Sequence, residues 1–487
     1  PAAAHKVING EDKFFLYFCN GGNGVSVLTA DDPAGPWTDP LGHGLITRAT
    51  PNCANVLWLF DPAVFVDDDG TGYLYFGGGV PEDKIANPGT IRCVQLGEDM
   101  ISIVGEPQVI DAPYVFEDSG MNKINGRYYY NYCSNWQTDG NTMGITSGAI
   151  NYMVSDSPMG PFTYCENSPV VYKATGFMRG AGHGCLFEDK NGHYWKMDTV
   201  SIGVNHMFER RLCLFPAKVE NGLIYTNAYR GDYPQLLPHD VSDPFTDSDA
   251  GRHLLSLHKT AKASSALGED HTPDKAFDES LRTWWSAETG NGGEWLWTDL
   301  GKAYEVCSVQ VNFADQDAEA VGGRGLGFAY RYTLEASVNG EDWFTLIDRR
   351  DSTEDLPHDY VQFENVTTLR YLKLTNCGAI PAGGKFAVSG LRVFGYGGGD
   401  APAKAPDFTV QRGEDTRNMT VTWKPVEGAQ GYFIRWGIDP HNLHTHWQVI
   451  GETEATVYCL TKGVTYYVTV DAYNESGVTR GTQTQII

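Results

Sequence analysis

The chain has 487 residues, more than one hydrophobic core normally organises, so we expect two to four domains. It contains 26 Tyr, 22 Phe, 12 Trp and 56 Gly, a composition that favours aromatic-rich β-strands joined by glycine turns over helices. Acidic residues outnumber basic ones by 61 to 36, a formal net charge of −25. Such a charge repels phosphate backbones and anionic lipid surfaces, so we expect neither nucleic acid nor a membrane as a partner. No apolar run approaches the roughly 18 residues of a membrane-spanning helix.

Residues 1 to about 240 repeat one phrase, in which a glycine turn precedes an aromatic strand. The turn glycines are Gly10, Gly70, Gly126 and Gly192, separated by 60, 56 and 66 residues. Common propeller blades repeat every 40 to 50 residues or so, and generous loops lengthen that repeat. We therefore expect four blades, which either form the whole propeller or follow a fifth blade upstream of Pro1.

A second phrase supports the same repeat. DDPAGPW at 31–37 and SDSPMGPF at 155–162 each follow an apolar strand, so we predict the same turn in two different blades.

Two β-sandwich modules are expected after the propeller. Residues 256–397 contain short strands with period-two alternation, namely CSVQVNF, YRYTLEASV, DYVQFENV, RYLKLTN and GLRVFG, as a sandwich requires. Residues 395–406 have the composition of a flexible linker. The segment that follows again alternates apolar and polar residues and has the size of an immunoglobulin-like sandwich. The predicted fold is all-β, with domains at 1–245, 256–397 and 407–487.

The ten cysteines show no CxxC pair and no close zinc-ligand spacing. We expect most of them to be buried free thiols, with one or two disulfides as the alternative.

The phrases DPAVFVDDDGTGYLYFGGG at 61–79 and APYVFEDSGMNKINGRYYYNYCSNW at 112–136 strongly resemble glycoside hydrolase family 43, a family of five-bladed propellers. The resemblance implies an enzyme that inverts at the anomeric carbon and releases xylose or arabinofuranose from plant cell-wall polysaccharides. It makes Glu117 the general acid and Asp61 the modulator that orients this acid and tunes its pKa. The family's general base lies on the first blade, whereas residues 1–48 resemble the second. No base is therefore assigned within this chain, and the first blade, as a separate segment, is an expected partner.

The residues themselves suit this chemistry. Asp61 and Glu117 are 56 residues apart, one repeat, so both should point at the propeller axis from adjacent blades. Paired carboxyl groups on either side of a glycosidic bond supply its acid and base, and like-charge repulsion keeps one of two neighbouring carboxyls protonated. The alternatives are a turn residue before Pro62 and an exposed carboxylate at a strand end. The run of three aspartates at 67–69 is interpreted as a hairpin turn, not as a metal loop.

His183 matches by position the family's axial histidine, which helps to hold a central calcium through water. A buried, hydrogen-bonded histidine is the alternative. We expect no required cofactor, with structural calcium as the one candidate ion.

Substrate binding is assigned to aromatic platforms and one arginine. Trp58, Phe116 and Trp136 are the candidate platforms, with packing in the blade cores as the alternative. Strand alternation should send only one of Arg210 and Arg211 inward, and we prefer Arg210, whose guanidinium could orient a carboxylate or bind a sugar hydroxyl.

Residues 275–301 and SGLRVFG at 389–395 resemble the discoidin, or factor 5/8 type C, fold, which in bacterial relatives implies a carbohydrate-binding module. The loop 278–283 resembles the calcium loop of such modules, although Ser389-Gly390 replaces their usual glutamate. We expect Trp284, Trp285, Trp295 and Trp297 to be core and rim residues and not a lectin cleft. Residues 407–487 resemble a fibronectin type III domain, usually a spacer.

The sequence thus predicts an exo-acting β-xylosidase or α-L-arabinofuranosidase whose partners are xylo- or arabino-oligosaccharides and hemicellulose. The expected location is outside a bacterial cytoplasm, by secretion, in the periplasm or at the cell surface, with the cytoplasm as the alternative. Two rival hypotheses remain: a catalytically incomplete, carbohydrate-binding propeller, and a glycan-adhesion protein led by the C-terminal modules.

Overall fold

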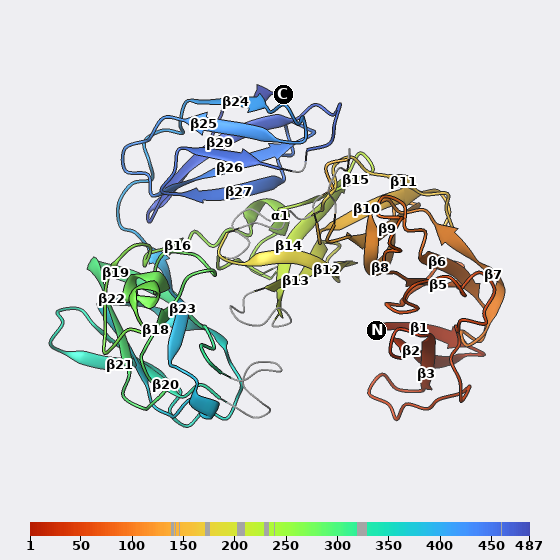
Figure 1. The fold of residues 1–487 in the computed structure, drawn as a ribbon, viewed down its shortest axis with the longest axis horizontal. Helices are drawn as coiled ribbons and strands as arrows, with labels where there is room; N and C mark the ends of the chain where they lie inside the picture. Colours follow the sequence, from red (N-terminus) through yellow and green to blue (C-terminus); the bar gives the residue numbers. More distant parts are fainter. Residues whose placement is uncertain are drawn as a thin grey trace.

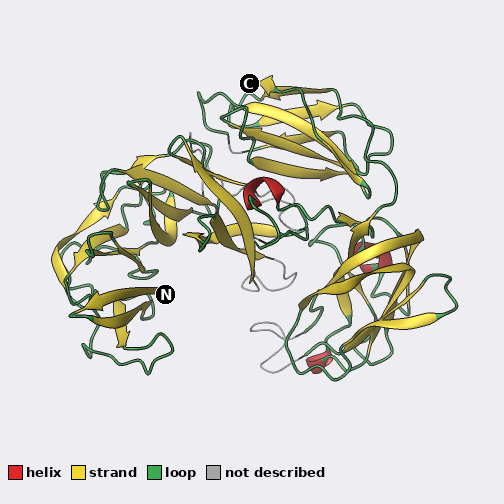
Figure 2. Ribbon diagram, turned by 180° about the vertical axis from the view of Figure 1, so that it is seen from behind, coloured by secondary structure: helices red, strands yellow, loops and turns green. Residues whose placement is uncertain are grey.

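A computed structural model describes residues 1–137, 141, 143–145, 147–170, 176–201, 210–227, 233–237, 239–318, 329–458 and 460–487. Its regular structure is almost entirely β (Figure 2). The described helical segments are short: α1 (Pro244–Asp247) and the 3-10 turns η1 (Glu269–His271), η2 (Pro273–Ala276) and η3 (Pro381–Gly383). None of the helices within these ranges has the length and apolar character needed to cross a membrane.

The N-terminal half forms four separate antiparallel sheets whose strands pair in chain order. The first sheet contains β1 (Ala2–Ile8), β2 (Glu11–Cys19) and β3 (Val25–Ala30), and the second contains β4 (Ala63–Val66), β5 (Gly72–Gly77), β6 (Ile91–Leu96) and β7 (Ile103–Ile110). The third contains β8 (Val115–Ile124), β9 (Arg127–Ser134), β10 (Ile150–Ser155) and β11 (Thr163–Tyr164), and the fourth contains β12 (Arg179–Glu188), β13 (Tyr194–Ser201), β14 (Arg210–Glu220) and β15 (Leu223–Thr226). The four predicted blades are confirmed.

The sheets follow one another along an arc (Figure 1). The first strand of each sheet contacts the first strand of the next, in the order β1, β4, β8 and β12. These four strands therefore face the hub, and side chains at their ends meet there.

The repeated glycine turns occupy the position that the sequence predicted. Gly10, Gly70, Gly126 and Gly192 have φ values of 78° to 85° and lie in the hairpins between the first and second strands of the four sheets. Such left-handed φ values favour glycine. The second phrase is also the same turn twice, because Gly35 and Gly160, with φ near 90°, follow β3 and β10.

Aromatic side chains fill the cores of these sheets, which explains the composition. Tyr17, Tyr75 and Tyr132 are completely buried. Each hydroxyl donates to a backbone carbonyl, those of Met100, Pro158 and Pro113, at 2.6 to 2.7 Å. A buried tyrosine needs such a partner for its hydroxyl.

The second module is one eight-stranded assembly around a large apolar core. Its strands are β16 (His253–Leu254), β17 (Thr260–Ala263), β18 (Trp285–Ser286), β19 (Trp295–Phe313), β20 (Tyr332–Ser337), β21 (Trp343–Asp348), β22 (His358–Asn376) and β23 (Ala387–Tyr396). The expectation of short strands was wrong for β19 and β22, which have 19 residues each. Register shifts interrupt their pairing near Asp299 and Val306, and such bulges let a strand bend and continue across the module.

The third module packs two sheets over a shared core. One sheet contains β24 (Phe408–Arg412), β25 (Met419–Trp423) and β28 (Glu454–Val457), and the other contains β26 (Gly431–Gly437), β27 (Thr445–Ile450), β29 (Tyr467–Asn474), β30 (Gly477–Thr479) and β31 (Gln485–Ile486). This is the predicted sandwich.

Buried and polar contacts join the three modules. The Arg392 guanidinium of the second module lies 4.7 Å from the ring of Phe177, which precedes β12 by two residues. In the third module, Arg417 and Thr461 donate to the carbonyls of Asn141 and Met143, both at 2.5 Å.

The nine cysteines in the described ranges are free thiols, as expected. Cys459 lies outside the described residues.

Candidate active site

Three neighbouring strands at the hub carry the predicted site. Asp61 lies two residues before β4, Glu117 is the third residue of β8, and His183 is in β12. One carboxylate oxygen from each acid and one imidazole nitrogen lie within 4.8 Å of one another. The structure therefore brings together two carboxyl groups that are one repeat apart, with the histidine of the next sheet beside them.

His183 lies between two carboxylates. Its Nε2 is 3.0 Å from Asp118 Oδ1, and its Nδ1 is 3.7 Å from Glu117 Oε1. Burial lowers the pKa of His183, but the contacts with Asp118 and Glu117 outweigh it and raise this pKa to about 10. The ring is therefore an imidazolium cation at neutral pH.

Asp118 is a site residue that the sequence reasoning did not single out. Its side chain is 8% exposed. Besides contacting His183, it accepts a hydrogen bond from the Gly184 N–H at 3.0 Å, and its own N–H donates to Asp61 Oδ2 at 3.4 Å. Its φ is 64°, a conformation that aspartate tolerates better than most residues. Asp118 thus links all three sheets of the site, and the adjacent acids at 117 and 118 were the only signal for it.

Asp61 also has an unusual environment. Its φ is 46°, and burial raises its pKa; His183 opposes this shift, and the nearby Glu117 and Asp118 charges add to it. A carboxyl with a raised pKa at a hub of converging strands is typical of functional sites.

A cavity of about 510 Å³ opens at the hub. Its lining includes Asp61, Asp118, Asn131 and His183, together with residues 1–3 of the first strand region. This volume falls in the usual range for small-molecule sites. The cavity is therefore large enough for a sugar beside the acidic cluster.

A buried ion pair lies behind the cavity wall. Lys196 Nζ is 2.6 Å from Asp198 Oδ1, and both side chains are at most 1% exposed. Burial raises the pKa of Asp198 to about 6, against the opposing effect of Lys196. A Cβ on Gly184 would lie 2.4 Å from Asp198 Oδ1, so only glycine lets β12 approach this pair so closely.

The predicted sugar-binding residues fall into two groups. The rings of Trp58 and Phe116 meet edge to face at 5.3 Å, and Phe116 directly precedes Glu117 in β8. Trp136, 56% exposed, packs over Gly148, and Arg210 is the partly buried first residue of β14. None of these four side chains is among those lining the hub cavity, and their roles in sugar binding stay predictions.

The candidate cation sites differ in how well they fit a metal. The 67–69 run forms the expected hairpin turn, with Lys123 Nζ 2.6 Å from Asp67 and 2.8 Å from Asp68. At the hub, one oxygen each of Asp61 and Glu117 and one ring nitrogen of His183 lie within 4.8 Å of one another, and calcium prefers oxygen ligands to a ring nitrogen. Direct coordination by His183 therefore fits poorly, while a calcium held through water stays a prediction.

In the 278–283 loop, Asp278 Oδ2 accepts from Thr283 Oγ1 at 2.6 Å, and Glu279 pairs with Arg392. These two acids therefore already have partners, and a calcium in this loop also stays a prediction.

Comparison with known proteins identifies each module. The family model for Glycosyl hydrolases family 43 matches residues 3–223, the F5/8 type C domain matches 260–388, and the Fibronectin type III domain matches 400–486. Xylosidase/arabinosidase 43A of Humicola insolens is 31% identical over 257 residues, which cover 42% of this chain and 68% of that protein.

The chain belongs to glycosyl hydrolase family 43. Two further relatives are arabinoxylan arabinofuranohydrolases. The protein from Paenibacillus polymyxa is 56% identical over 210 residues, and the one from Bacillus subtilis (strain 168) is 59% identical over 172 residues. The matches cover 41% and 34% of this chain, and about a third of each relative, 32% and 33%.

Proposed function

We propose that this chain carries the acid-catalytic part of an exo-acting, inverting glycosidase that removes α-L-arabinofuranosyl groups from arabinoxylan. The observation that carries the proposal is the convergence of Asp61, Glu117 and His183 at the hub of a family 43 propeller. The names of the relatives that are 56% and 59% identical favour arabinofuranose over xylose.

Glu117 is proposed as the general acid. Its side chain is 17% exposed, and although Glu117 is not itself among the residues that line the hub cavity, its chain neighbour Asp118 is. It would protonate the glycosidic oxygen of the leaving group as the bond to the anomeric carbon breaks. The His183 imidazolium, 3.7 Å away, would then stabilise the carboxylate left on Glu117.

Asp61 is proposed as a positioning residue and not as the base. An inverting enzyme needs about 6.5–9.5 Å between its acid and base carboxyls, to leave room for water. Oxygens of Asp61 and Glu117 approach within 4.8 Å, which is too close. Asp118 is occupied by His183 and the Gly184 N–H, so it is not the base either, and no base is assigned.

The experiment measures hydrolysis of 4-nitrophenyl α-L-arabinofuranoside and 4-nitrophenyl β-D-xyloside by the full 487-residue chain. We expect Glu117→Gln to lower kcat/KM by about 10²–10⁴-fold, the usual contribution of a general acid. Glu98→Gln is the matched control, because the Glu98 side chain is fully exposed. If Glu117→Gln hydrolyses these compounds as fast as the parent chain, the assignment of the acid is wrong. If the parent chain binds arabinoxylan but hydrolyses neither compound, the binding-only hypothesis replaces the hydrolase.

A further inference from the structure

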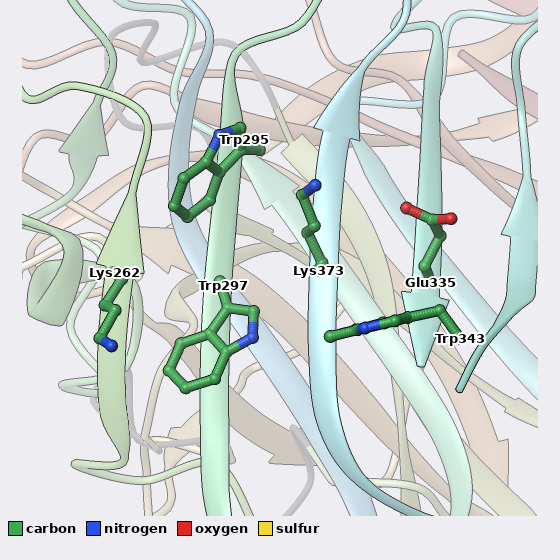
Figure 3. A pocket seen from close by; sticks show the side chains of 6 residues that line it. All are labelled: Lys262, Trp295, Trp297, Glu335, Trp343 and Lys373. Atoms are coloured by element: carbon green, nitrogen blue, oxygen red, sulfur yellow. The ribbon is translucent and has the colours of Figure 1, made fainter. Parts of the chain in front are cut away.

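The F5/8 type C module carries a hollow on one face of its sheet, far along the chain from the hub residues. Its volume is about 510 Å³, and Figure 3 shows the side chains that surround it. The lining consists of three indoles, two ammonium groups and one carboxylate, from Lys262, Trp295, Trp297, Glu335, Trp343 and Lys373.

The strand register builds this face. Lys262 of β17 pairs with Trp297 of β19, Trp297 pairs with Lys373 of β22, and Lys373 pairs with Glu335 of β20. These four residues form one row across four adjacent strands. Trp295, two residues before Trp297, projects from the same face.

The intervening residues of the same strands point the other way. Leu296, Leu334, Leu372 and Leu374 are completely buried in the module's core. The indoles thus occupy the outer face of the sheet, where an isolated module would normally present polar side chains. The expectation of core and rim positions holds for Trp285, which is completely buried, but Trp295 and Trp297 line the hollow instead.

Local contacts hold the rings in place. Trp297 stacks on Tyr371 with a centroid distance of 5.7 Å and an interplanar angle of 25°, and Trp343 Nε1 donates to the Gly340 carbonyl at 3.1 Å. The three indoles remain partly exposed in these positions. Rings that are fixed before binding lose little entropy when a ligand stacks on them.

The charged groups of the hollow have no ion-pair partner. Lys262 Nζ lies 5.1 Å from the Trp297 ring centroid, and Lys373 Nζ lies 5.5 Å from that of Trp295. Within the described ranges, neither lysine forms a salt bridge, and neither does Glu335. The two ammonium groups and the indole N–H groups are hydrogen-bond donors, and the Glu335 carboxylate is the acceptor among the lining side chains.

We infer that this sheet face binds a polysaccharide strand, at a site separate from the hub cavity. A sugar presents an apolar ring face, which stacks on an indole, and hydroxyls that both donate and accept. The lysines supply donors to those hydroxyls, and Glu335 supplies an acceptor. An apolar peptide or lipid would bury Lys373 and Glu335 without partners, at a high cost, and the net charge of −25 repels nucleic acid and anionic lipid.

The position of the face suits a polymer. Figure 1 places β21 and β22 on the side of the module away from the four N-terminal sheets, whereas Arg392 on β23 contacts Phe177, just before β12 of those sheets. The hub cavity and the hollow share no lining residue. A polysaccharide held on this face would keep the hub cavity near the same polymer and raise the effective concentration of cleavable sugar groups.

The test measures retention on insoluble arabinoxylan, with Glu117→Gln as the background so that the probe is not consumed. We expect Trp297→Ala and Trp343→Ala each to weaken binding at least tenfold, and Lys373→Met to weaken it severalfold. Tyr360→Ala is the matched control, because Tyr360 is 43% exposed on the same module but does not line the hollow. Trp297→Phe should recover part of the binding, which a merely unfolded module would not do.

Two results would overturn the inference. One is unchanged retention of both tryptophan variants. The other is an equal loss of retention for Tyr360→Ala, which would show that the effect does not come from the hollow. Because retention is measured without hydrolysis, failure of this site and failure of the proposed hydrolase are distinguishable.

Discussion

Replacing Arg392 with alanine should destabilise the second module strongly, because this arginine is a buried charge with specific partners. Its side chain and that of Glu279 are each 2% exposed. The guanidinium donates to both Glu279 oxygens at 2.6 and 3.1 Å and to Gln310 Oε1 at 2.8 Å. It also lies 4.7 and 4.9 Å from the rings of Phe177 and Phe394.

The expected loss of stability follows from the partners that Arg392 loses when it is replaced. Arg392→Ala removes the arginine that pairs with the buried Glu279 carboxylate, and breaking a buried ion pair from one side costs about 3–5 kcal/mol. A module of about 140 residues has an unfolding entropy of about 0.3 kcal/mol/K, so its Tm should fall by about 10–17 °C. The contact with Phe177 is lost as well, so the second module and the four N-terminal sheets should unfold less cooperatively with each other.

Differential scanning calorimetry of the full chain measures both effects. The double variant Arg392→Met with Glu279→Leu is the informative companion, because replacing both charges by apolar groups is often neutral. We expect it to recover most of the lost Tm. A fall of less than about 3 °C for Arg392→Ala, or an equal fall for the double variant, would show that the buried pair does not control the stability of this module.

Three further predictions concern the hub. Asp61→Asn should lower kcat/KM for the aryl arabinofuranoside by about 10²-fold through misplacement of the acid, and unchanged kinetics would remove Asp61 from the mechanism. The pKa of His183 is raised to about 10, so its ion pairs stabilise the fold fully below pH 6.5 and lose this effect as the pH rises through 10. The difference in unfolding free energy between the parent chain and His183→Asn, measured by urea unfolding, should therefore shrink between pH 6.5 and pH 10. A difference that grows over this range would contradict the positive charge assigned to His183. Gly184→Ala should cost about 1–3 kcal/mol by overpacking, because its Cβ would lie 2.0 Å from the Met197 carbonyl oxygen; an unchanged Tm would show that β12 relaxes freely.

Repeat spacing predicted the blades, and for the two acids that the family resemblance had singled out it also predicted that they would meet. The four turn glycines fix where each first strand ends, so residues one repeat apart arrive at equivalent places near the axis. Asp118 could not be found this way, because its role depends on a φ of 64° that turns its side chain toward β12. Nothing in the local sequence around 118 indicates this conformation.

The outer face of the second module shows a different limit of sequence reasoning. Alternation in β19 indicates that Trp295 and Trp297 share one face and Leu296 the other, but both faces are apolar, so the pattern does not say which is the core. The choice depends on β17, β20 and β22, which lie beside β19 only in the folded sheet. The long strands were missed for a related reason, since the bulges that let β19 and β22 continue through apparent breaks depend on pairing partners.

The third module is more than a terminal tether. Arg417 and Thr461 fasten the main-chain oxygens of residues 141 and 143, which belong to the connection between β9 and β10. Later in the same connection, Gly148 packs closely against Gly182, the chain neighbour of His183. A Cβ on Gly182 would lie only 2.5 Å from the Gly148 carbonyl oxygen. A chain shortened at residue 406 would lose these contacts with residues 141 and 143, and we expect its kinetics to differ from those of the 487-residue chain.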